Sequence, residues 1–96
     1  MVKIPIIIRP DYIWYIEDVE GNQFMHCDVF NWSKTVWKQL RKDFLVFAAL
    51  HGGPLYVCKE HETTGYLKFI KGLGFKFLKP IMSFSGKEVY IYYWSK

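Results

Sequence analysis

The chain has few cysteines, no long apolar run and no low-complexity tract, and each shortage excludes a class of protein. Two cysteines among 96 residues cannot form a disulfide framework, so a reducing compartment is expected. The run at residues 6–8 is too short for a membrane span and lacks the cleavage site of a signal peptide. No repeat or linker divides the sequence. We therefore expect a single cytoplasmic domain, residues 1–96, with no membrane partner.

Aromatic residues are abundant, with 7 Tyr, 8 Phe and 4 Trp. Their burial offsets chain entropy, which excludes a disordered chain. Some rings should reach the surface, either as its ordinary apolar fraction or as a protein-binding patch or homodimer face. The net charge of +4 is modest. It allows an acidic partner but disfavours nucleic acid, which usually requires a denser basic cluster.

Three strands and a long helix are predicted in the first half of the chain. The strands cover residues 2–8, 12–19 and 23–30, and Pro5 either places the first at a sheet edge or delays its start to Ile6. Asn31 or Ser33 should cap a helix that runs to about Leu50. Its expected buried stripe is Val36, Leu40, Phe44, Phe47 and Ala48, joined by Trp37. Its opposite face is basic and carries Lys34, Lys38, Arg41 and Lys42.

The second half predicts a strand at 55–58, a second helix and a closing hairpin. Thr63 or Thr64 should begin this helix, and Gly72 and Gly74 should end it, because glycine adopts a left-handed turn without steric cost. Phe75 should return to the core, against the first helix. Strands 81–84 and 89–94 follow, joined by Ser85-Gly86-Lys87. The predicted fold is α+β, in the order β-β-β-α-β-α-β-β, with two helices packed on a mixed sheet.

The end of the second helix reads Phe69-Ile70-Lys71-Gly72-Leu73-Gly74-Phe75. It resembles the closing helix of the GNAT family of N-acetyltransferases, which commonly ends in an aromatic-Glu-Lys-Leu-Gly-Phe pattern between a strand and a hairpin. The resemblance covers residues 24–94. Internal virion proteins of tailed phages with an acetyltransferase-like fold are similar in helix spacing and aromatic richness. The resemblance implies a GNAT-like sheet and, for a phage protein, a place in the host cytoplasm or the virion.

The resemblance fails at the family's cofactor loop, Arg/Gln-x-x-Gly-x-Gly/Ala, which holds the pyrophosphate of acetyl-CoA. Residues 29–34 contain no glycine, and Trp32 should fill the space of the phosphates. If acetyl-CoA did bind, Asn31, Ser33 and Lys34 would hold it. Ile70 occupies the position of the family's frequent tyrosine acid, and Thr63 that of an asparagine. No cofactor is therefore expected, and no catalytic residue can be assigned.

Polar side chains at the carboxyl ends of the parallel strands mark where any small-molecule site should lie. They are Asp28, Asn31, Lys59, Glu60 and His61. The cysteines and histidines lack the C-x-x-C or H-x-x-x-H spacing of a metal site, so none is expected. Cys58 and His61 could act as nucleophile and base only if the fold brings them into contact. Cys27 and Cys58 could face each other as thiols on neighbouring strands.

We expect a non-catalytic protein-binding module on an acetyltransferase-like scaffold, acting by contact with a host or virion protein. The candidate surfaces are the basic helix face and the aromatic residues Tyr90, Tyr92 and Trp94 near the C-terminus. The alternative is an acetyl-CoA-dependent N-acetyltransferase. A weaker alternative is a small nucleic-acid-binding module, in which the basic face follows phosphates and the tyrosines stack on bases.

Overall fold

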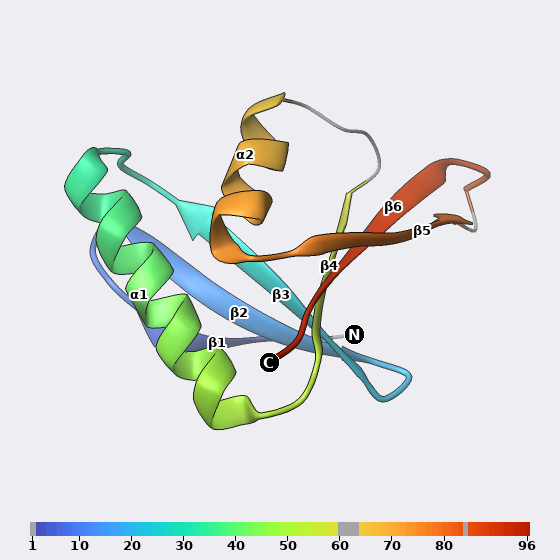
Figure 1. Ribbon diagram of the computed structural model, residues 1–96, viewed down its shortest axis with the longest axis horizontal. Coiled ribbons are helices and arrows are strands. Elements are labelled where there is room, and N and C mark those ends of the chain that lie inside the picture. The colour runs from blue at the N-terminus through green and yellow to red at the C-terminus, as the bar shows by residue number, and fades with distance from the viewer. Residues whose placement is uncertain (1, 60–63, 84) are drawn as a thin grey trace.

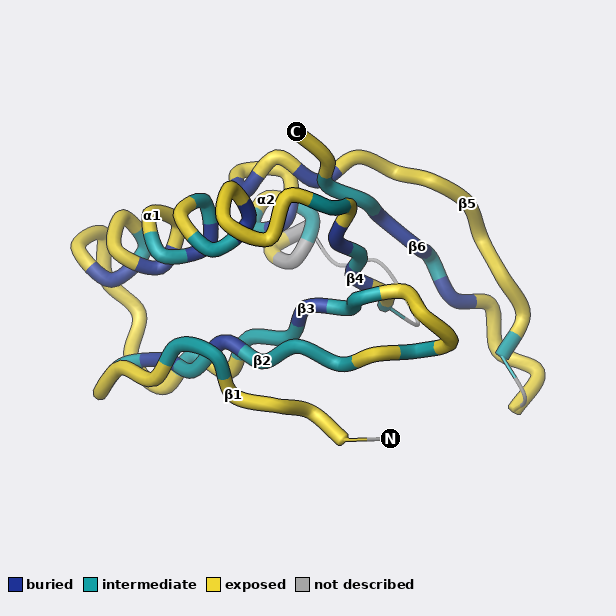
Figure 2. The backbone as a smooth tube through the Cα atoms, turned by 90° about the horizontal axis from the view of Figure 1, so that it is seen from below, coloured by how far each residue is buried: buried dark blue, intermediate teal, exposed yellow. Residues whose placement is uncertain are grey.

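A computed structural model describes residues 2–59, 64–83 and 85–96. The elements are β1 (Lys3–Ile8), β2 (Tyr12–Val19), β3 (Asn22–Val29), α1 (Lys34–His51), β4 (Leu55–Lys59), α2 (Thr64–Leu73), β5 (Lys76–Met82) and β6 (Glu88–Trp94). The strands form one sheet in the order β1-β2-β3-β4-β6-β5, in which only β3 and β4 are parallel. Both helices lie on the same face of this sheet (Figures 1 and 2). The α+β class and the element order agree with the prediction.

The N-terminal strands form an antiparallel meander. Pro5 lies within β1, which is an edge strand, so the first of the two predicted alternatives is correct. An edge tolerates proline because the missing N–H is not needed by a neighbouring strand. The β2–β3 hairpin turns through Glu20 and Gly21, whose φ angles of 53° and 87° suit a two-residue hairpin loop.

Ser33, rather than Asn31, caps α1. Its Oγ accepts the N–H of Val36 at 3.0 Å. At the other end, Gly52 has a φ of 78° and donates its N–H to the carbonyl of Ala48 at 3.1 Å. Four members of the predicted stripe are buried, and Phe47 and Trp37 pack partly buried beside them. The prediction of this helix is confirmed.

Gly74 ends α2 as predicted, whereas Gly72 has a different role. Gly74 has a φ of 102°, and its N–H and that of Phe75 close back onto the carbonyls of Lys71 and Ile70, each at 3.0 Å. This is the Schellman arrangement, in which the second residue after the helix packs against the last turn. Phe75 is buried, with its ring 5.3 Å from that of Phe44 on α1.

Gly72 does not adopt a left-handed conformation, so the prediction that it turns the chain is wrong. It lies inside the last turn of α2, where a Cβ would be 2.8 Å from Cζ2 of Trp37. Its missing side chain therefore allows α2 to approach α1. Thr63, predicted as one possible cap of α2, lies outside the described residues.

The strand predicted at 81–84 begins much earlier, at Lys76, and ends at Met82; Phe84 lies outside the described residues. Lys79 and Pro80 interrupt its apolar pattern, which conceals the strand in the sequence. The structure accommodates them because β5 is the other edge of the sheet and its register shifts between Phe77 and Lys79.

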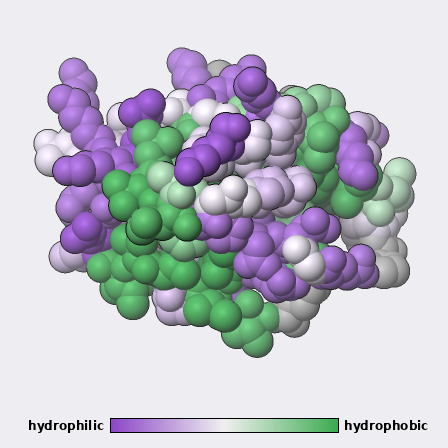
Figure 3. All heavy atoms as spheres, turned by 60° about the horizontal axis from the view of Figure 1, so that its bottom comes forward, coloured by the Kyte–Doolittle hydropathy of each residue, from purple (hydrophilic) through white to green (hydrophobic). Residues whose placement is uncertain are grey.

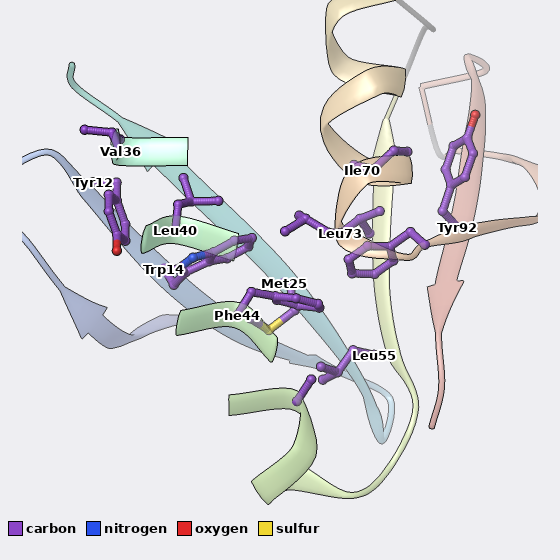
Figure 4. Close-up of a cluster of buried hydrophobic side chains, with 13 residues drawn as sticks. Tyr12, Trp14, Met25, Val36, Leu40, Phe44, Leu55, Ile70, Leu73 and Tyr92 are labelled. Atoms are coloured by element: carbon purple, nitrogen blue, oxygen red, sulfur yellow. The ribbon is translucent and has the colours of Figure 1, made fainter. Parts of the chain in front are cut away.

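The core lies between the helices and the sheet (Figure 4). Its largest fully buried side chains are Trp14, Tyr12, Phe44, Leu40, Leu55, Ile70 and Leu73. The rings of Trp14 and Phe44 are 5.2 Å apart, which joins β2 to α1. Aromatic contacts of this kind add to the free energy gained from burial alone.

Candidate functional site

A cleft lies where β3 and β4 separate. The two strands share one registered pair, Phe24 with Tyr56, and then diverge towards their carboxyl ends beneath α2 (Figure 1). The cleft measures about 200 Å³. Its apolar lining comes from Trp14, Met25, Val57, Phe69, Ile70 and Leu73. Its polar lining comes from Lys3, His26, Cys27, Asp28, Cys58 and Lys59.

This position agrees in part with the predicted small-molecule site. Asp28 and Lys59 line the cleft, whereas Asn31 does not. Glu60 and His61 lie outside the described residues, so the proposed Cys58–His61 pair does too.

The predicted cofactor loop already uses two of its three candidate groups within the fold. The side-chain amide of Asn31 donates to Asp11 at 3.1 Å, and the hydroxyl of Ser33 caps α1. Lys34 is exposed in the first turn of α1. Trp32 meets Phe69 of α2 edge to face, with the ring centroids 5.8 Å apart. The Trp32 side chain thus joins this loop to α2.

The cysteines lie on opposite faces of the sheet. Cys27 is opposite Trp14 and packs against the core, whereas Cys58 is exposed and follows the buried Val57. Because side chains alternate along a strand, the two thiols do not face each other as predicted. Burial, with a smaller contribution from Asp28, raises the pKa of Cys27 to about 12, so its thiol stays protonated at neutral pH.

The histidines make local contacts. His26 Nε2 lies 2.9 Å from a carboxylate oxygen of Glu17, and His51 Nδ1 accepts the N–H of Gly53 at 3.3 Å. Within the part of the chain that the structure describes, no three His, Cys, Asp or Glu side chains are placed to hold a metal ion.

Asp43 joins α1 to the β1–β2 turn through a network that the sequence did not indicate. Arg9 donates to both of its carboxylate oxygens, at 2.9 and 3.0 Å, and the hydroxyl of Tyr12 donates at 2.5 Å. Burial, together with the bond to Asp43, raises the pKa of Tyr12 to about 12. The partners are more than 30 residues apart in sequence, and no local pattern links them. The network ties the β1–β2 turn to α1.

The basic face of α1 is not uniform. Arg41 donates its Nε–H to the backbone carbonyl of Gly72 at 2.9 Å and so satisfies the end of α2. Lys34, Lys38 and Lys42 are exposed. All four predicted surface cations are therefore exposed, and Arg41 in addition links the two helices.

The aromatic residues of β6 do not form the predicted surface. Tyr92 is buried, so its ring is not accessible to a partner, and Trp94 packs edge-on against Phe44 at 5.9 Å. Tyr90 is partly buried, 6.5 Å from Phe77. The reason is topological, because β5 and not β6 forms the edge of the sheet.

Instead, the exposed apolar surface lies on β5, all seven residues of which are exposed. We call Phe77, Leu78, Ile81 and Met82 the β5 surface; they are 52%, 44%, 42% and 68% exposed. They divide between the two faces of the strand, because Phe77 and Met82 are paired with Tyr92 and Glu88 on one face and Ile81 is paired with Val89 on the other. Leu78 and Ile81 also line a hollow of about 400 Å³ with Phe24, Tyr56 and Ile91. Apolar residues gather in patches rather than singly on the face shown in Figure 3.

No protein-family model matches the chain, and no curated protein matches it either. Within the described residues, neither helix is long and apolar enough to cross a membrane. Function has to be inferred from the side chains and their arrangement.

Proposed function

We propose that this chain is a non-catalytic protein-binding module that contacts its partner through the β5 surface. The observation that carries the proposal is an edge strand with four exposed large apolar side chains, two of which, Leu78 and Ile81, line one hollow with Phe24, Tyr56 and Ile91. Exposed apolar residues that gather beside a hollow are typical of binding sites on protein surfaces. The hollow beside Leu78 and Ile81 provides a concave site for a side chain of the partner.

The chemistry of β5 indicates the kind of partner. Pro80 has no N–H, and the register shift beside Leu78 disturbs the outer edge, so addition of a partner strand by backbone pairing is disfavoured. Docking therefore relies on side chains. Lys76 and Lys79 lie on the same strand as the apolar residues, and β5 contains no acidic residue. The partner is accordingly a protein segment that presents apolar side chains together with carboxylates.

A labelled synthetic peptide that alternates glutamate with leucine and phenylalanine provides the probe, with binding read by fluorescence anisotropy. We expect saturable binding that the double variant Leu78→Ser and Ile81→Ser weakens at least tenfold, because both residues line the hollow. The double variant Val46→Ser and Leu50→Ser is the matched control, because these residues of α1 are also exposed. A peptide with lysine in place of glutamate tests the charge preference. Equal loss in both variants, or no saturable binding, would refute the β5 surface as the docking site.

A second candidate, an acetyl-CoA-dependent N-acetyltransferase, has one supporting observation. The diverging parallel strands open a cleft beneath the helix whose end resembles the GNAT pattern, and the strand order is compatible with a GNAT-like scaffold. Against it stands the loop at 29–34, where Asn31 and Ser33 are engaged and Trp32 contacts Phe69. A phage protein that keeps such a scaffold for contact with a host or virion protein would account for both features.

A further inference from the structure

The net charge of +4 conceals a strong separation of charge along the chain. Residues 1–28 contain five acidic side chains and only two basic ones. The two helices contain six basic side chains and one acidic one, Asp43. Both helices lie on one side of the sheet (Figure 2), so this layer is far more basic than the net charge suggests.

Asp43 does not offset these positive charges, and Arg41 is exposed but held in place by one bond. The Asp43 carboxylate is neutralised by Arg9 and hydrogen-bonded by Tyr12, and the Arg41 guanidinium is bound to the Gly72 carbonyl. Five exposed lysines remain, and none forms an ion pair within the described part of the chain. We call them the helix-layer lysines: Lys34, Lys38, Lys42, Lys68 and Lys71.

One of these lysines, Lys68, lines an open aromatic cleft. It measures about 340 Å³ and is lined by Trp32, Trp37, Gly65, Lys68 and Phe69, with no carboxylate among them. Phe69 holds the two indoles in place, with centroid distances of 5.8 Å to Trp32 and 5.6 Å to Trp37. Trp32 is nevertheless 60% exposed, so much of its ring is available for stacking.

We propose that the helix layer binds single-stranded nucleic acid, with a base against Trp32 in the aromatic cleft and the phosphates on the helix-layer lysines. Proteins that bind single strands with little sequence preference combine exposed aromatic rings, on which bases stack, with cations that follow the phosphate backbone. A duplex hides the faces of its bases and cannot use the cleft. Lys71 shares a hollow with Phe77 of the β5 surface, but no β5 residue is among the residues that line the aromatic cleft, so substitutions at Trp32 and at Ile81 test the two proposals separately.

The probe is a fluorescent oligonucleotide of about 12 nucleotides, a length that small single-strand-binding domains cover. Fluorescence anisotropy is measured with the intact chain across a range of salt concentrations. We expect the affinity to fall as salt rises, and Lys38→Gln to reduce the slope of log K against log salt by about 0.7 for one lost phosphate contact. Lys79→Gln on β5 removes the same charge elsewhere and should leave that slope unchanged.

Substitution at Trp32 separates base stacking from general attraction to a polyanion. Trp32→Ala should weaken binding about tenfold at every salt concentration without changing the slope, and Trp32→Phe should restore most of the affinity. A duplex of the same length should bind more weakly than the single strand. The proposal is overturned if no binding occurs at low salt, if the duplex binds as well, or if Trp32→Ala has no effect. A competition experiment gives a further test, in which the glutamate-containing peptide is added to the oligonucleotide complex of the protein that carries the double serine substitution on β5. If the peptide displaces the oligonucleotide, the helix layer is a site for acidic protein and the proposal is overturned.

Discussion

A side-chain carbon on Gly72 would lie 2.8 Å from Cζ2 of Trp37 and 3.0 Å from Cη2. Favourable contacts between carbon atoms lie near 3.5–4.0 Å, so there is no room for a methyl group at this point. The approach of α2 to α1 therefore depends on a position without a side chain. The ring of Trp37 also contacts Phe69, three residues before Gly72 on α2, with the ring centroids 5.6 Å apart.

Gly72→Ala should therefore destabilise the protein by about 1–3 kcal/mol, the usual cost of overpacking. Helix propensity alone would predict the opposite change in stability, because alanine favours a helix interior more than glycine does. Gly65→Ala is the control, because it belongs to the same helix and no atom lies within 4 Å of the point that its Cβ would occupy. Chemical denaturation measures both. Equal stability of the two variants would contradict the packing argument.

Gly74→Val should cost about 1–2 kcal/mol or more, because valine at positive φ strains the backbone. A Cβ at this position would also lie 3.1 Å from Cδ1 of Trp94. Gly86 has a positive φ as well, but nothing lies within 4 Å of its Cβ position. Gly86→Val should therefore lose less stability than Gly74→Val in thermal unfolding. The reverse order would show that the contact with Trp94 contributes nothing.

Arg41→Met should lower the free energy of unfolding by about 0.5–1.5 kcal/mol, the typical net value of one hydrogen bond. The reason is the lost bond to the Gly72 carbonyl. Lys38→Met removes a neighbouring exposed charge and should stay within about ±0.5 kcal/mol of the parent. Both changes preserve helix propensity, so urea denaturation compares the contacts directly. If the two variants lose the same stability, Arg41 is only a surface charge.

Asp43 should make stability depend on acid pH. Burial opposes ionisation of its carboxyl group, but the bonds from Arg9 and Tyr12 and the charge of Arg9 outweigh this and hold the pKa of Asp43 below its ordinary value. Because the folded pKa lies below the unfolded value of about 3.9, the stabilisation is present above that pH and disappears as the pH falls through the folded pKa.

Asp43→Asn tests this dependence. The variant should be less stable than the parent at neutral pH, and the difference should shrink as the solution is acidified towards pH 2. Glu20→Gln serves as the control for loss of one carboxylate, because Glu20 is exposed at the hairpin tip. A difference between parent and Asp43→Asn that does not change with pH would contradict the ionic account of this network.

Acetyl-CoA should bind no more tightly than millimolar, as measured by calorimetric titration. A pyrophosphate needs several convergent N–H groups, each charge-assisted bond being worth about 1.5–3 kcal/mol. Asn31 and Ser33 are already engaged, and Trp32 is fixed against Phe69. Saturable micromolar binding that Lys34→Glu abolishes would instead favour the acetyltransferase.

The elements with regular hydrophobic periodicity could be predicted from sequence. The stripe of α1 and the glycine turn at Gly74 depend on neighbours a few residues away, which the sequence displays directly. The full extent of β5 could not be predicted, because Lys79 and Pro80 are tolerated only through its edge position. That position is a property of the whole sheet, and a local pattern carries no information about it.

The candidate sites are less predictable from sequence than the fold. The sequence does not show that Tyr92 is buried. Its alternation with Tyr90 and Trp94 indicates that the three share one face of a strand, but not that the helices pack on that face. The bond from Arg41 to Gly72 spans 31 residues, and lysine and arginine look alike in a helical pattern until their contacts are known. Nor does the net charge show that the acidic residues lie mainly in the first strands and the basic ones on the helices.

The single registered pair between β3 and β4 divides the sheet into two hydrogen-bonded ladders, β1-β2-β3 and β4-β6-β5. Cooperative unfolding therefore depends on side chains that contact both. Phe44 is such a residue, since its ring lies 5.2 Å from Trp14 of the first ladder, and 5.9 Å from Trp94 of the second. One phenyl ring on α1 thus couples two units that would otherwise open and exchange their amide hydrogens independently.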